Sequence, residues 1–124
     1  MSWTVVVADD DPDIRTLVGI AAAKAGLEVL ASVGDGEAAL QAIRQHRPDL
    51  AILDISMPER TGLDVVREAR ADDSLGDLRI VLLSASVDDV SQEAGLGSGA
   101  DYFMTKPFSP RELAAFLSVG KEAR

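Results

Sequence analysis

Residues 50–54 read Leu-Ala-Ile-Leu-Asp, four apolar side chains in a row that end at a carboxylate. A strand that is apolar at every position is buried on both faces, which is typical of a parallel sheet covered by helices. Residues 3–8 and 79–83 are nearly as continuous in Val, Ile, Leu and Ala. The pattern therefore predicts an α/β fold with these strands in its middle layer.

Working outward from this stretch, five strands alternate with helical patterns. The predicted strands are Trp3–Ala8, Glu28–Ser32, Leu50–Leu53, Arg79–Leu83 and Tyr102–Met104. Each strand is followed by a helical pattern. The first three predicted helices have apolar residues at helical spacing from Ile14 to Ala25, with Gly26 as a stop, over Glu37–His46, and at Leu63, Val66 and Ala69. The fourth is predicted within Asp88–Leu96, and the last begins with the capping box Ser109-Pro110-Arg111-Glu112 and buries Leu113, Phe116 and Leu117. This order predicts a single (βα)5 doubly wound domain over residues 1–124 with a five-stranded parallel sheet.

Composition narrows the class of protein. The 124 residues are 47% hydrophobic and 27% charged, and none is cysteine, which excludes disulfides and thiolate metal sites. The 21 acidic and 12 basic side chains give a net charge of −9, which argues against direct binding to nucleic acid or to an anionic membrane. No apolar run approaches the roughly 20 residues of a membrane span, and no signal peptide is apparent, so a cytoplasmic location is expected.

Polar or charged side chains that could bind a ligand follow four of the predicted strands. They are Asp9-Asp10-Asp11 after the first, Asp54 after the third, Ser84 after the fourth and Lys106 after the fifth. In an open parallel sheet, ligands bind beyond the carboxyl ends of the strands. The sequence thus predicts a site at one edge of the sheet that combines carboxylates, a hydroxyl and an ammonium group.

Three of these residues also have a structural interpretation. Asp11 is expected to be a helix N-cap, since Pro12 follows it at the first helical position. Asp54 alone could form a turn, and Lys106, ahead of a proline, could be a solvated strand end. Asp9 and Asp10 lack such an explanation, because adjacent carboxylates repel one another unless a cation neutralises them. An oxygen-seeking ion such as Mg2+ suits them.

Five segments carry a resemblance to a known family. They are residues 5–15, 48–58, 62–63, 83–85 and 99–108, which contain the acidic triplet, Asp54, Gly62-Leu63, Leu83-Ser84-Ala85 and Lys106-Pro107-Phe108. Together they resemble the response-regulator receiver family of two-component signalling, in the family's order and over essentially the whole chain.

The resemblance implies a flavodoxin-like fold with strand order 2-1-3-4-5, and it implies a role for each site residue. Asp54 would be the phosphoacceptor, and Mg2+ or Mn2+ would be held by Asp9, Asp10, Asp54 and the backbone carbonyl of Ser56. Ser84 would be the switch hydroxyl, Lys106 the phosphate-pairing lysine and Phe103 the switch aromatic.

The same resemblance implies partners. The phosphodonor would be a histidine kinase or a phosphotransfer protein. Phosphorylation would switch the face of the fourth helix, fifth strand and fifth helix toward a downstream protein or an output domain not in this chain. The domain would catalyse only its own phosphotransfer and dephosphorylation, so it would not be a turnover enzyme.

Two other functions remain open at the level of sequence. A small Mg2+-dependent phosphatase resembling the haloacid dehalogenase family would use Asp9 as nucleophile with Asp11 beside it, but would leave Asp54 unexplained. A non-phosphorylated pseudo-receiver would serve only protein interaction, although the acids and the lysine are all present. A dinucleotide binder is disfavoured because no glycine-rich loop follows the first strand.

Overall fold

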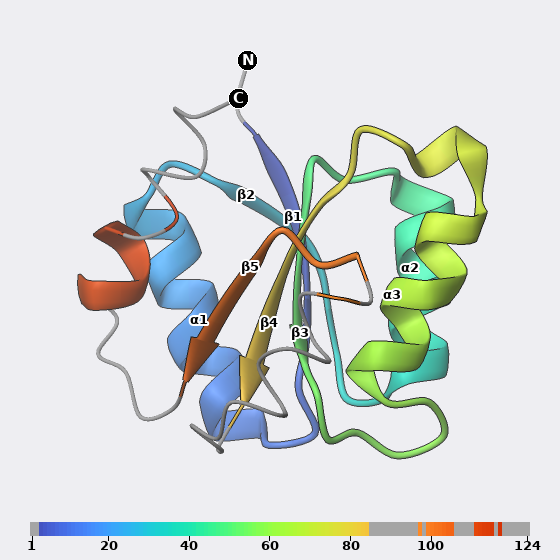
Figure 1. Ribbon diagram of the computed structural model, residues 1–124. Coiled ribbons are helices and arrows are strands. Elements are labelled where there is room, and N and C mark those ends of the chain that lie inside the picture. Colours follow the sequence, from blue (N-terminus) through green and yellow to red (C-terminus); the bar gives the residue numbers. More distant parts are fainter. Residues whose placement is uncertain (1–2, 85–96, 98, 106–110, 116, 118–124) are drawn as a thin grey trace.

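The computed structural model describes residues 3–84, 97, 99–105, 111–115 and 117. Its centre is a five-stranded parallel sheet in the order β2-β1-β3-β4-β5, which confirms the predicted fold class and strand order (Figure 1). The strands are β1 Thr4–Ala8, β2 Glu28–Val33, β3 Leu50–Asp54, β4 Arg79–Ser84 and β5 Tyr102–Thr105. Every predicted strand is found, and no boundary differs by more than one residue.

The strand ends lie slightly further along the chain than predicted. β3 and β4 run on into Asp54 and Ser84, because Asp54 still pairs with Leu83, and Ser84 with Thr105. The first polar side chain after an apolar run is therefore still part of the hydrogen-bonded ladder in these two strands. The sheet itself therefore holds Asp54 and Ser84.

The described helices are α1 Pro12–Lys24, α2 Gly36–His46 and α3 Gly62–Ala71, with a short 3-10 turn, η1, at Asp73–Leu75. Figure 1 shows α1 on one side of the sheet, with the helical residues 111–115 beside it, and α2 and α3 together on the other side. The predicted helix within Asp88–Leu96 lies outside the described residues, as do Ser109, Pro110 and Phe116 of the last one. No helix in the described part of the chain is long and apolar enough to cross a membrane.

Side-chain caps fix where the helices begin. The Asp11 carboxylate accepts from the Asp13 N–H at 2.9 Å, with Pro12 behind it, which confirms Asp11 as the predicted N-cap. At α3, Thr61 and Asp64 form a reciprocal capping box. Helix α2 begins one residue earlier than predicted, because Asp35 is its cap and accepts from the Ala38 N–H at 2.7 Å.

The Asp35 cap leads to a stability prediction. Asp35→Ala leaves a donor of the first turn without this acceptor, so we expect it to lower the free energy of unfolding by about 1 kcal/mol. Urea unfolding followed by circular dichroism measures the change. Asp35→Asn is the matched control, since asparagine caps equally well, and equal losses in the two variants would contradict the assignment.

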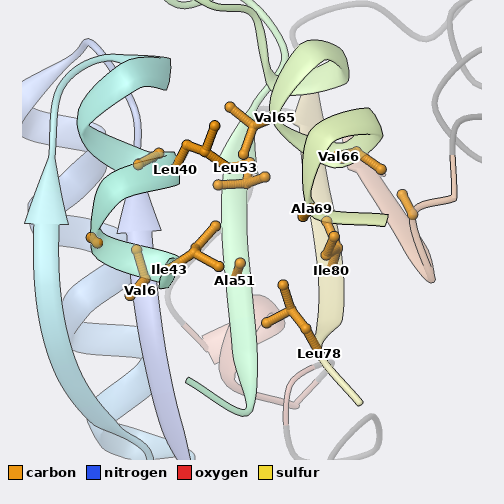
Figure 2. Close-up of a cluster of buried hydrophobic side chains, with 14 of the residues drawn as sticks. Val6, Leu40, Ile43, Ala51, Leu53, Val65, Val66, Ala69, Leu78 and Ile80 are labelled. Carbon is orange, nitrogen blue, oxygen red and sulfur yellow. The ribbon is translucent and has the colours of Figure 1, made fainter. Parts of the chain in front are cut away.

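The sheet separates two hydrophobic clusters. In β1, Val6 and Ala8 face α2 and α3, whereas Val5 and Val7 face α1 and the helical residues Leu113 and Leu117. Figure 2 shows the first cluster, in which side chains of β1, β3 and β4 meet those of α2 and α3; its labelled members are Val6, Leu40, Ile43, Ala51, Leu53, Val65, Val66, Ala69, Leu78 and Ile80. Strands β1, β3 and β4 are therefore buried on both faces, as their apolar runs predict, whereas half of the residues of the edge strand β2 are exposed and the rest are partly buried.

Candidate functional site

The carboxyl ends of the strands meet at one edge of the sheet, at the bottom of the view in Figure 1, where the arrowheads of β4 and β5 point. Register places the predicted residues there. Ala8 pairs with Leu53, so Asp9 and Asp54 follow at the same level on neighbouring strands. Ser84, at the end of β4, pairs with Thr105 of β5. The sheet therefore brings together residues that are far apart in sequence.

Three carboxylates converge at this edge. Asp9, Asp10 and Asp54 each offer an oxygen, and these oxygens lie within 4.8 Å of one another. Asp9 is fully buried and Asp54 is 5% exposed, while Asp10 is open to solvent. Buried like charges at this separation disfavour one another unless a cation or a hydrogen-bond donor neutralises them. The donor set is oxygen only, with an open side toward water, and it fits a hard ion such as Mg2+.

Asp9 is held in place by its neighbours. Its Oδ1 accepts from the Asp11 N–H at 2.9 Å, and its backbone carbonyl accepts from Arg15 Nη1 at 2.7 Å. Its own N–H donates to the Val33 carbonyl of β2 at 3.1 Å. These three bonds fix the turn that leads from β1 into α1, and with it the direction of the acidic pair.

Asp11 has a different role from its two neighbours. Its side chain caps α1, and it is not part of the group of three converging carboxylates. The phosphatase alternative needs Asp9 and Asp11 at one reaction centre. The observed arrangement instead joins Asp9 to Asp54, the residue that this alternative leaves without a role.

The loop after Asp54 is closely held by backbone contacts. The Ile55 N–H donates to the Leu83 carbonyl at 3.0 Å, and the Gly62 N–H returns to the Ile55 carbonyl at 2.8 Å. A Cβ at Gly62 would lie 2.3 Å from the Asp54 carbonyl oxygen, so only glycine fits there. Ser56, the predicted carbonyl donor, lies in this loop two residues beyond Asp54 and is exposed.

The remaining predicted residues are on β4 and β5. Ser84 is 6% exposed at the end of β4. Phe103 pairs in register with Leu82 and is partly buried against the cluster between the sheet and α2 and α3. Lys106 follows Thr105, the last residue of β5, and lies outside the described residues, so its predicted role stays a prediction.

Sequence reasoning did not identify two arginines near the site. Arg15 contacts the carbonyl of Asp9, and Arg60, in the loop after Asp54, forms ion pairs with Glu37 and Glu68. The signal for Arg15 was its place one turn into the helix that follows the acidic triplet. Arg60 gave no signal, since it is 23 residues from Glu37.

A hollow of about 320 Å³ lies at the opposite edge of the sheet, beside the amino end of β4, and none of the three converging carboxylates lines it. Arg70 from α3 lines it and donates to the carbonyls of Gly99 and Leu78 and to the Asp101 carboxylate, at 2.7–2.9 Å. These hydrogen bonds give the guanidinium a structural role, because they connect α3 to the start of β5.

Comparisons with known proteins agree with the geometry. The sequence pattern of the response regulator receiver domain matches residues 5–118. The DNA-binding response regulator MtrA of Mycolicibacterium smegmatis is 43% identical over 115 residues, which are 93% of this chain and 49% of MtrA.

Among solved structures, the chemotaxis response regulator CheY4 of Vibrio cholerae superposes with a TM-score of 0.88 at 29% identity, covering 96% of this chain and 98% of CheY4. The BeF3-activated DrrB receiver domain has a TM-score of 0.87 at 28% identity, covering 98% of this chain and 99% of that one. The chain spans about half the length of the curated relatives it matches.

Proposed function

This chain belongs to the response regulator receiver domain family, and on that premise we propose that it accepts a phosphoryl group on Asp54 from a phosphohistidine donor. The observation that carries the proposal is the convergence of Asp9, Asp10 and Asp54 within 4.8 Å at the carboxyl edge of the sheet. Asp54 ends the central strand β3, whose backbone is paired on both sides. Of the three carboxylates, it alone belongs to a residue within a strand.

The roles of the other two carboxylates follow from their surroundings. Asp9 is fully buried, and its Oδ1 accepts the Asp11 N–H. Asp10 is exposed, so water can complete a cation's shell on its side. We assign Asp10 and Asp54 as direct ligands, with Asp9 acting through water and the Ser56 carbonyl as a further ligand. Bound Mg2+ or Mn2+ would neutralise charge on the carboxylates and on the phosphoryl oxygens.

The transfer conserves atoms and electrons. A carboxylate oxygen of Asp54 attacks phosphorus, an O–P bond forms, and the P–N bond to the donor imidazole breaks, with its electron pair returning to nitrogen. Dephosphorylation is the attack of water on phosphorus, which restores the carboxylate and releases inorganic phosphate. The protein is a signalling domain, and we propose that these two steps on its own residue are its only chemistry.

The same premise assigns the residues that respond to the phosphoryl group. We propose that the Ser84 hydroxyl donates to a phosphoryl oxygen, that Lys106 pairs with another, and that Phe103 turns as Ser84 moves. Ser84 and Phe103 lie on adjacent, directly paired strands, β4 and β5, which supports a coupled movement of the two side chains. This is a local charge event that biases a surface with two arrangements.

The partners are proposed at the level of class. The donor is a histidine kinase or a phosphotransfer protein in the cytoplasm. MtrA is named as a DNA-binding response regulator and matches this chain over only 49% of its length. We therefore propose that the switched face acts on a downstream protein or an output domain outside these 124 residues.

Intact mass tests the proposal most directly. After incubation with a small acyl-phosphate donor and Mg2+, we expect one phosphoryl group per chain, and none when the metal is chelated. Peptide mapping should place the group on Asp54. A group on Asp9 would favour the phosphatase alternative, and no labelling at all would favour the pseudo-receiver.

Metal binding gives a separate prediction. Asp10→Ala removes one ligand, so we expect Mg2+ to bind at least about tenfold more weakly. Without metal, the variant should be as stable as wild type or more stable, because a like charge has left the cluster. Isothermal titration and thermal unfolding in chelator measure the two effects.

The control for this prediction is Asp77→Ala. It changes the net charge equally at an exposed position beside the distant hollow of about 320 Å³. It should bind Mg2+ nearly as wild type does. Equal affinities of wild type and Asp10→Ala would contradict the assigned ligand.

A further inference from the structure

Arg60 connects the loop after Asp54 to both helices on that side of the sheet. Its Nε donates to Glu37 Oε2, in the first turn of α2, at 2.5 Å, and its Nη1 forms a second ion pair with Glu68 Oε2 of α3. No other guanidinium among the described residues forms ion pairs with two helices. We call these three side chains the Arg60 clamp.

The main chain of the loop follows the same path. The Pro58 carbonyl accepts from the Gly36 N–H at 3.2 Å and from the Arg60 N–H at 2.8 Å. A Cβ at Gly36 would lie 1.9 Å from the Arg60 carbonyl oxygen, so loop and α2 are in direct backbone contact. Met57, one residue beyond Ser56, is buried in the cluster under α2 and α3.

The loop needs such support because its conformation is unfavourable on its own. Glu59 has φ 70°, in the left-handed region that non-glycine residues rarely adopt. Residues held there cost free energy and persist only where the surroundings fix them. Arg60, the next residue, supplies two charge-assisted bonds at that point.

The charged groups of the Arg60 clamp shift one another's pKa. The hydrogen bond from Arg60 holds the pKa of the Glu37 carboxyl below its usual range, against a smaller opposing effect of desolvation. Glu37 first, and then Glu68, raise the pKa of Arg60. All three side chains are more than a third exposed, at 36–45%. Ion pairs this exposed contribute little to global stability, so their effect is expected to be local.

We propose that Arg60 is a positioning residue for the acidic site: by tying the loop to α2 and α3, it fixes the main chain at Ser56 and so the cation shell beside Asp54. The inference rests on the proposed function, in which the Ser56 carbonyl is a ligand. Arg60 would not contact the cation itself; it would affect cation binding only by holding the loop that carries Ser56.

The test is the affinity of the full chain for Mn2+, measured from free Mn2+ by electron paramagnetic resonance. We expect Arg60→Ala to weaken binding about tenfold, the size typical of lost outer-shell support, with its unfolding temperature within a few degrees of wild type. The direction is informative, because removing a positive charge by itself strengthens cation binding. A loss of affinity therefore reports position and not charge.

The matched control is Arg67→Ala. Arg67 lies on α3 and forms an ion pair with Asp64 of the same helix, at 3.6 Å. It removes the same charge without touching the loop, so its Mn2+ affinity should equal or exceed that of wild type. Arg60→Lys should recover part of the loss, since an ammonium can pair with one of the two carboxylates.

A second readout needs no metal. Amide exchange of Gly36 and Gly62, whose N–H groups bond to the Pro58 and Ile55 carbonyls, should speed up in Arg60→Ala while β3 stays protected. If Arg60→Ala binds Mn2+ as tightly as wild type, or leaves this exchange unchanged, the inference is overturned and the proposed function stands. If wild-type protein binds no Mn2+, both are overturned.

Discussion

Asp54→Ala protein should take up no phosphoryl group under conditions in which wild type takes up one per chain. A methyl group offers no oxygen to attack phosphorus, and the other two carboxylates of the cluster are differently placed. Asp9 Oδ1 accepts the Asp11 N–H, and Asp10 is exposed beyond the strand end. Intact mass spectrometry after treatment with an acyl-phosphate donor and Mg2+ measures the difference, which is all or nothing.

Two controls make this result specific. Circular dichroism should show Asp54→Ala folded, because the substitution removes a nearly buried charge from a cluster of like charges. Asp11→Asn should be labelled like wild type, since asparagine keeps the cap of α1. Full labelling of Asp54→Ala would sink the assignment, and loss of labelling in Asp11→Asn would support the phosphatase alternative.

Gly62→Ala should strongly destabilise the protein, because the added methyl group would collide with the backbone at the end of β3. Its Cβ would lie 2.3 Å from the carbonyl oxygen of Asp54 and 3.0 Å from the Ile55 Cα. Both atoms are backbone, at the end of a strand paired on both sides, so they cannot turn away as a side chain could. We expect a loss of about 3 kcal/mol or more in the free energy of unfolding, measured by urea denaturation.

Gly19→Ala is the opposite case and the matched control. Gly19 lies inside α1, where an added Cβ would meet nothing within 4 Å. Alanine is the better helix former, so this variant should gain about 0.5–1 kcal/mol. Equal effects of the two substitutions, in sign and size, would contradict the close approach of α3 to the backbone of Asp54.

Much of the secondary structure depends on residues that are close in sequence, so it can be predicted from the sequence alone. The apolar run Leu50–Leu53 predicts a strand buried on both faces because side chains alternate faces along a strand. The cap at Asp11 is equally readable, since its acceptor and donor are two residues apart. The gathering of the acids at one edge of the sheet was also predictable, because the carboxyl ends of parallel strands lie at the same edge.

Other properties of the site were decided by tertiary structure. Asp9 and Asp10 are adjacent in sequence, yet one is fully buried and the other is exposed. Their distance to Asp54 depends on the register of β1 against β3, which no pattern within either strand contains. The need for glycine at position 62 comes from the path of a neighbouring backbone, not from a turn signal.

The Arg60 clamp shows the difference most clearly. Glu37, Arg60 and Glu68 are ordinary surface residues in sequence, and nothing in their spacing indicates a contact. They meet because α2 and α3 pack on the same face of the sheet and Arg60, in the loop after Asp54, forms an ion pair with one residue of each helix. Periodicity and capping extend over a few residues, so the sequence determines the helices and strands and the edge of the sheet at which the polar site residues gather. Contacts between residues far apart depend on strand register and helix packing, and only the folded chain establishes them.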